Sequence, residues 1–147
     1  MLEWKSDYET GVPELDAQHK VLFANINQIG KLLEKPEIER SEADRLLVFL
    51  ENYARQHFGG EETCMERFRC PAHARNKMEH EMFLHVLRIA RDEFEAATMP
   101  RKVLERLHES MDWWLNDHIL KVDVQLKGCV GKTASGGKKR SAPRIDI

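Results

Sequence analysis

The chain has 147 residues, a length typical of one domain with a single core, and its 41% hydrophobic and 33% charged residues are normal for a soluble helical protein. No apolar stretch approaches the roughly 18 residues of a membrane-spanning helix, so we expect no membrane insertion. The net charge of -2 is unevenly spread, because residues 132–147 hold five lysines and arginines and one aspartate. The remaining body is acidic, which argues against nucleic-acid binding.

Residues 1–12 lack helical periodicity and are predicted to form an extended arm. A first helix is predicted over residues 13–34, because apolar side chains recur at steps of three, four and seven and Pro13 suits a first helical turn. A second helix should begin near Ser41 and end before Cys70, since the residue that precedes a proline disfavours the α conformation.

A third helix is predicted over residues 71–97, and a fourth from Pro100 until before Gly128. Residues 131–147 are rich in Gly, Ser and Lys and are predicted to form a flexible basic tail, so the folded domain would span residues 1–130. Four helices joined by short loops favour an all-α, up-down-up-down four-helix bundle that carries the extended N-terminal arm.

The cysteines are odd in number and include no CxxC pair: Cys64, Cys70 and Cys129. We therefore expect no disulfide framework and a reducing, cytoplasmic location. The N-terminus has no basic segment followed by an apolar run, so no signal peptide is expected.

Six residues of metal-ligand type fall on the four predicted helices: His19, His57, Glu61, His80, His118 and Asp123. Imidazole favours iron, copper, zinc and nickel, while carboxylate oxygen favours harder ions, so the mixed set points to non-haem iron. Four imidazoles and two carboxylates suit two octahedral iron ions bridged by the carboxylates. Bundles build such sites from inward side chains on facing helices.

The spacing of these residues predicts one irregularity. His57 and Glu61 are four residues apart and share a helix face. His118 and Asp123 are five apart, which is about 140° of rotation on a straight α-helix. A π-bulge within residues 118–123 would bring the two side chains together, and π-bulges are frequent at functional sites.

A lone helical histidine is more often a surface or core residue than a ligand, and we expect His85 and His108 to be non-ligands. Gly59 and Gly60 lie between two candidate ligands, where they either permit close helix packing or form an exposed, tolerated pair.

Four segments of the chain resemble the bacterial hemerythrins: Trp4 to His19, His57 to Glu62 (HFGGEE), Cys70 to Phe83, and Trp114 to Asp123 (WLNDHILKVD). The resemblance covers about residues 4–126. It implies two iron ions (Fe2+/Fe3+) with a bridging oxo or hydroxo group.

The resemblance also implies individual roles. One iron would take His19 and His57, the other His80 and His118, and Glu61 and Asp123 would bridge them. O2 would bind at an open position against five apolar residues that also fit plain bundle core: Leu22, Phe58, Trp114, Leu115 and Ile119.

One position departs from the family pattern. The third helix of the family carries two histidines four residues apart, and here Asn76 stands where the first belongs. Its amide oxygen, a water or nothing would fill that position. His73 could replace the histidine only if the start of the helix were remodelled.

The sequence thus favours a di-iron protein that binds O2 reversibly for storage, delivery or sensing, and not an enzyme. We expect a monomer that serves an oxygen-consuming recipient protein. The alternative is a di-iron enzyme acting on peroxide or nitric oxide, and a third hypothesis is a regulatory module whose arm or tail changes its contacts on oxygenation.

Overall fold

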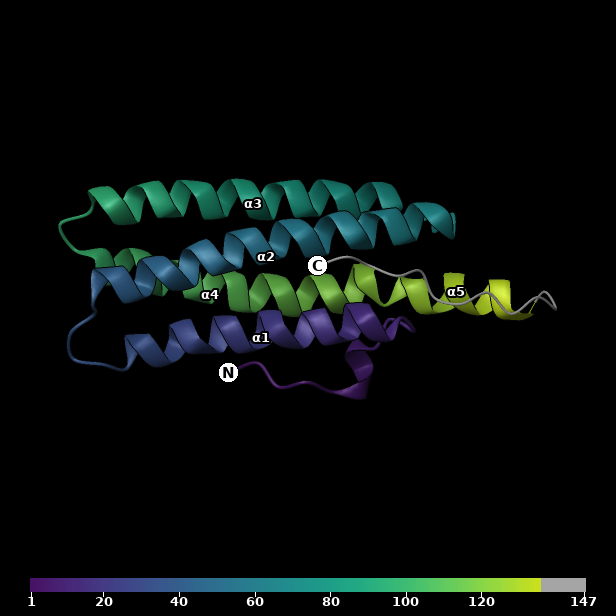
Figure 1. Ribbon diagram of the computed structural model, residues 1–147, viewed down its shortest axis with the longest axis horizontal. Helices are drawn as coiled ribbons and strands as arrows, with labels where there is room; N and C mark the ends of the chain where they lie inside the picture. Colours follow the sequence, from purple (N-terminus) through teal and green to yellow (C-terminus); the bar gives the residue numbers. More distant parts are fainter. Residues whose placement is uncertain (136–147) are drawn as a thin grey trace.

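The computed structural model describes residues 1–135, and side chains as far as residue 131. Four long helices run antiparallel in an up-down-up-down bundle (Figure 1): α1 (Pro13–Leu33), α2 (Arg40–Arg67), α3 (His73–Ala96) and α4 (Pro100–His118). Each helix packs against its neighbours in chain order, and α1 also packs against α4, which closes the bundle. The predicted all-α architecture is confirmed.

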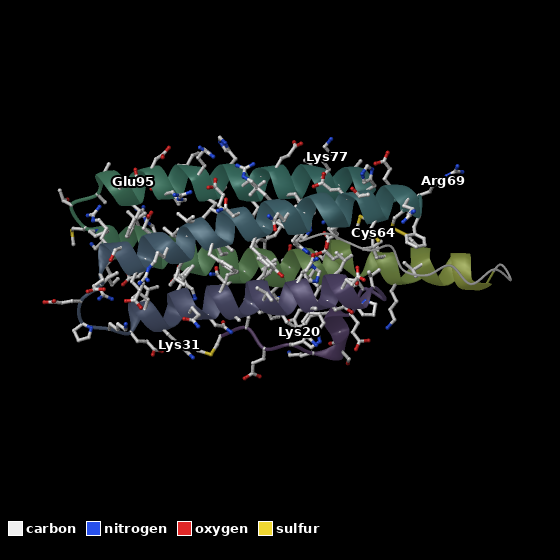
Figure 2. All side chains as sticks on the ribbon, in the orientation of Figure 1. Lys20, Lys31, Cys64, Arg69, Lys77 and Glu95 are labelled. Carbon is white, nitrogen blue, oxygen red and sulfur yellow. A yellow bond between two sulfur atoms is a disulfide. The ribbon has the colours of Figure 1, made fainter. Side chains whose placement is uncertain are left out.

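The bundle forms because each helix has one apolar stripe to bury. Ile26 of α1, Leu47 of α2, Leu87 of α3 and Leu104 of α4 are all buried in one core between the helices. Charged side chains point the other way, as Lys31, Lys77 and Glu95 do in Figure 2.

The N-terminal arm is extended apart from one 3-10 turn, η1 (Ser6–Tyr8), and it is held against the bundle by hydrogen bonds. The Leu2 backbone N–H donates to Asn27 Oδ1 over 2.9 Å, and Asn27 Nδ2 donates back to the Leu2 carbonyl over 2.8 Å. Tyr8 is buried, and its hydroxyl donates to Asn116 of α4. The arm therefore packs as part of the core.

The end of the fourth helix contains the predicted irregularity. A π-helix, η2 (Ile119–Asp123), follows α4 directly, and the Val124 N–H donates to the Ile119 carbonyl, five residues back, over 3.0 Å. The predicted distortion within residues 118–123 is confirmed.

The predicted helix end before Gly128 is wrong, because α5 (Gln125–Ser135) continues to Ser135. A helical glycine costs about 1 kcal/mol relative to alanine, and burial of Leu126 beside Val12 and Leu15 offsets that cost. The rest of the predicted basic tail, residues 136–147, lies outside the described residues.

The expectation of no disulfide is also wrong: Cys70 and Cys129 are bonded, with a Cα–Cα distance of 5.6 Å. Cys70 follows Arg69, whose φ of 50° turns the chain sharply after α2. Cys129 reaches it only because α5 continues past Gly128 along this end of the bundle. Cys64 is the free cysteine in the described part of the chain, and it is buried.

Gly59 and the apolar character of the helices test two more of the sequence predictions. Gly59 is exposed, and a Cβ there would meet nothing within 4 Å, so close helix packing does not explain it. None of the helices within residues 1–135 combines the length and apolar character needed to cross a bilayer.

Candidate metal centre

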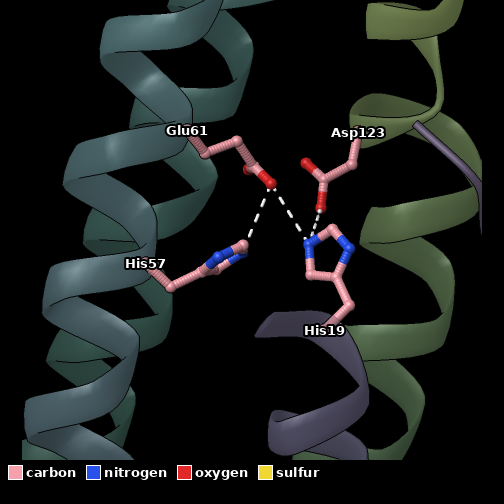
Figure 3. Close-up of side chains that lie close together, drawn as sticks. All are labelled: His19, His57, Glu61 and Asp123. Atoms are coloured by element: carbon pink, nitrogen blue, oxygen red, sulfur yellow. Dashed lines mark hydrogen bonds and ion pairs between the residues drawn. The ribbon is translucent and has the colours of Figure 1, made fainter. Parts of the chain in front are cut away.

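All six candidate ligands converge in the interior of the bundle. His19 comes from α1, His57 and Glu61 from α2, His80 from α3, His118 from the end of α4, and Asp123 from the π-helix. Each is at most 1% exposed. They form two groups that could each hold a metal ion, and the groups share Glu61 and Asp123. Figure 3 shows the group that contains His19 and His57.

The shared carboxylates each face both groups. Glu61 Oε2 lies 3.1 Å from His19 Nε2 and 3.3 Å from His57 Nε2, while its Oε1 lies 3.0 Å from His80 Nε2. Asp123 Oδ2 lies 3.1 Å from His19 Nε2, and its Oδ1 lies 3.0 Å from His118 Nε2. One oxygen of each carboxylate is thus available to each of two ions.

The separations fit metal coordination. Adjacent ligands of an octahedral ion at about 2.1 Å stand about 3.0 Å apart. Glu61 Oε1 and Asp123 Oδ1 are buried and make no well-aligned hydrogen bond among the described residues, although an imidazole nitrogen lies 3.0 Å from each. A proton or a metal ion must lie between a carboxylate oxygen and an imidazole nitrogen at this separation, and the donors present fit two metal ions.

The π-helix is what turns Asp123 inward. Five residues of straight α-helix would separate it from His118 by about 140°. A wider π turn returns the fifth residue to nearly the same face, which brings Asp123 Oδ1 to 3.0 Å from His118 Nε2.

An outer set of hydrogen bonds orients three of the imidazoles. The Nδ1–H of His57 donates to Gln18, that of His80 to Glu62 Oε2 over 2.9 Å, and that of His118 to Glu79 Oε1 over 2.9 Å. Because each Nδ1–H is held by its acceptor, each Nε2 faces the centre, where it can give its lone pair to a metal ion that displaces any proton on it.

These three acceptors were not predicted from the sequence, although a simple signal exists. Gln18, Glu62 and Glu79 are each the immediate sequence neighbour of a candidate ligand. Each one serves a ligand on the next helix of the bundle, so the pairing becomes visible only when the helices are packed.

The two buried carboxylates shift the pKa values of the histidines around them, in the direction that favours positive charge in the centre. Burial lowers the pKa of His19, but hydrogen bonds to Asp123 and Glu61 outweigh it and raise the pKa to about 10. Burial also lowers the pKa of His80, but hydrogen bonds to Glu61 and Glu62 outweigh this effect and raise the pKa to about 9. Burial raises the pKa of Glu61, but the charge of His57 and bonds to His19 and His80 hold it well below its usual value.

The five predicted O2-pocket residues belong to the core around the ligands. Phe58 stacks on His80 with ring centroids 3.8 Å apart, and Trp114 stacks on His118 at 4.3 Å. Leu22, Leu115 and Ile119 are buried in the same core, while Trp114 is half-buried. Their role in O2 binding stays a prediction.

The remaining histidines lie outside both ligand groups. His85 is exposed, and His73 is half-buried at the first turn of α3. His108 packs against Gly30, where a Cβ would meet its Nε2 at 2.8 Å. Among the described residues no histidine takes the place of Asn76.

A four-helix bundle that gathers four histidines and two carboxylates into two overlapping groups places the chain among the helical-bundle metal-binding proteins. Over residues 10–129 the chain matches the Hemerythrin HHE cation binding domain, and it belongs to that family.

Similar proteins support this family membership. The bacteriohemerythrin of Clostridium acetobutylicum is 27% identical over 129 residues, covering 84% of this chain and 96% of the relative. That of Methylococcus capsulatus is 28% identical over 131 residues, covering 88% and 97%. A crystal structure of wild-type hemerythrin superposes with a TM-score of 0.73 at 28% identity, over 88% of this chain and 97% of that one. The chain accordingly belongs to a family of cation-binding domains.

Proposed function

We propose that the chain is a di-iron protein that binds O2 reversibly, in storage, delivery or sensing. The observation that carries the proposal is the pair of buried ligand groups that share both Glu61 and Asp123. A mixed set of imidazoles and carboxylates favours iron over the purely hard or soft ions.

In the proposed centre, His19 and His57 would hold one ion and His80 and His118 the other. Glu61 and Asp123 would be shared between the two ions, since each carboxylate has one oxygen toward either pair of histidines. When bound, the two irons supply an open coordination position and the electrons for reversible O2 binding.

The protein's own residues would protect that position. Phe58 and Trp114 lie flat against two ligand imidazoles, and the other pocket residues, Leu22, Leu115 and Ile119, present only apolar surface. Such a wall excludes water and anions, which slows irreversible oxidation of the metal.

The alternative function, a di-iron enzyme acting on peroxide or nitric oxide, is disfavoured by the family membership. Only Asn76 favours it, because a missing imidazole would open a second exchangeable position. A cytoplasmic, monomeric protein with an oxygen-consuming recipient remains our prediction for its context, but the Cys70–Cys129 bond removes the cysteine argument for a reducing compartment.

The test is an optical spectrum of anaerobically iron-loaded protein before O2, after O2 and after argon purging, with iron counted per chain. Two irons and an oxygen-dependent visible band that argon reverses are expected. Irreversible oxidation on the first exposure would contradict reversible binding and move the enzyme hypothesis to first place.

A further inference from the structure

Asn76 lies inside the centre although it is not one of the six candidate ligands. It is on α3, one turn before His80, and it is fully buried. Its Oδ1 lies 2.8 Å from His118 Nε2, and that same nitrogen lies 3.2 Å from His80 Nε2 and 3.0 Å from Asp123 Oδ1. The amide oxygen thus stands at the separation expected of adjacent ligands on one ion.

The lone pairs show why an ion belongs there. Glu79 accepts the Nδ1–H of His118, and Glu62 accepts that of His80, so each Nε2 faces inward and can give its lone pair to a metal ion that displaces any proton there. Asn76 Oδ1 and Asp123 Oδ1 add further lone pairs to the same space. A proton on one Nε2 can satisfy only part of this set, whereas one metal ion satisfies all of it.

The amide nitrogen gives a second, independent indication. Asn76 Nδ2 is buried and has no hydrogen-bond partner among the described residues. A buried amide N–H group without a hydrogen-bond partner destabilises the folded state. The side chain keeps its oxygen toward the centre in spite of that cost.

We propose that Asn76 Oδ1 is the fifth protein ligand of the ion held by His80 and His118. This inference rests on the proposed metal centre. The ion at this position takes two imidazoles, two carboxylate oxygens and one amide oxygen, while the ion at His19 and His57 has no amide ligand. The two positions are therefore chemically unequal.

The amide ligand should change which metal ions the position beside Asn76 prefers. A carbonyl oxygen is a harder ligand than imidazole and suits Mn2+ better relative to Zn2+. We expect the position beside Asn76 to bind Mn2+ and Fe2+ well, and to be the weaker of the two for Zn2+.

The test uses two substitutions that keep the branched shape of the side chain. Asn76→Asp retains an oxygen ligand, and Asn76→Leu removes every donor. Anaerobic titrations of the full chain with Mn2+ and with Fe2+ give the affinity of each of the two ions separately. Asn25→Leu is the matched control, since Asn25 is also buried but belongs to neither ligand group, and its Nδ2 donates to the Leu46 carbonyl of α2.

The expected result is specific to one ion. Asn76→Leu should weaken binding of the ion at His80 and His118, the second ion, by about tenfold or more. Binding of the first ion, at His19 and His57, should stay nearly unchanged. Asn76→Asp should bind the second ion at least as tightly as the parent chain, and Asn25→Leu should bind both ions as the parent does. Circular dichroism of each metal-free variant establishes that it folds.

Two results would overturn the proposal. If Asn76→Leu bound the second ion as tightly as the parent or more tightly, the amide would be a packing group or a hydrogen-bond donor to His118. If the parent bound one ion only, there would be no second ion for Asn76. Failure of the proposed metal centre looks different, because the parent would then bind neither ion.

Discussion

The imidazole orientation at the metal centre depends on single hydrogen bonds from residues outside the ligand set. Glu62 is the clearest case, because its described side-chain partner is His80 Nδ1, whereas Glu79 also pairs with Arg75. Losing such an acceptor frees the ring to rotate and to change tautomer.

We therefore predict that Glu62→Leu lowers the affinity for the second metal ion by about 10–100-fold. Glu62→Gln should restore most of it, since an amide oxygen still accepts the Nδ1–H. Affinity is measured by anaerobic Fe2+ titration, with Glu66→Leu, an exposed position one turn further along α2, as the control. Equal losses in all three variants would show that Glu62 has no special role.

Protons and metal ions compete for the same imidazoles. The raised pKa values of His19, about 10, and His80, about 9, mean that both rings are protonated in the metal-free protein at neutral pH. Binding an ion must displace those protons, so metal affinity should rise as pH increases from 7 to 9 and fall below 7. Calorimetric titrations in buffers of different ionisation enthalpy measure the protons released. An affinity that stayed flat or declined over that range would show that the two rings are already neutral.

At the scale of the elements, two helices contain a locally unfavourable feature, and one of these features places a ligand. The π-helix at Ile119–Asp123 lacks the regular α-helical hydrogen bonds for one turn, and its wider turn directs Asp123 into the interior. Gly59 weakens α2, because glycine is a poor helix former. A Cβ added at this position would meet no atom within 4 Å, so there is space for a side chain.

Gly59→Ala should accordingly raise the free energy of unfolding of the metal-free protein by about 1 kcal/mol, a rise of roughly 2–4 °C in Tm. Thermal unfolding followed by circular dichroism measures it. Gly30→Ala is the contrasting variant, because its Cβ would meet His108 Nε2 at 2.8 Å and should bring no gain. Destabilisation by Gly59→Ala would mean that the glycine has a conformational role in α2.

At the scale of the whole molecule, the disulfide joins parts that are distant in sequence. Cys70 follows α2 and Cys129 lies in α5, 59 residues further along the chain. Around them a second apolar cluster, which includes Leu15, Met65 and Leu126, closes the end of the bundle near the metal centre.

Opening this bond should destabilise the fold. For a loop of about 60 residues, chain entropy gives up to about 4 kcal/mol, and Cys129→Ser should lower the unfolding free energy toward that limit. Urea unfolding with and without a reductant is the measurement. The reductant should destabilise the parent and leave Cys129→Ser unchanged; a parent indifferent to reductant would show that the bond contributes no stability.

The sequence by itself determined the bundle and the residues that could form the centre. Apolar spacing and the prolines at residues 13, 71 and 100 are local signals, and they placed the four helices. The awkward five-residue step from His118 to Asp123 even predicted the π-helix, because rotation along one helix is computable from spacing alone.

Only the tertiary structure decided which residues meet across helices. The pairing of Glu62 with His80, the bond from Cys70 to Cys129 and the inward turn of Asn76 Oδ1 each join two elements. Periodicity shows which face of a helix is buried, but not its axial alignment with its neighbours. Packing sets that alignment, and with it the contacts that orient the proposed ligands.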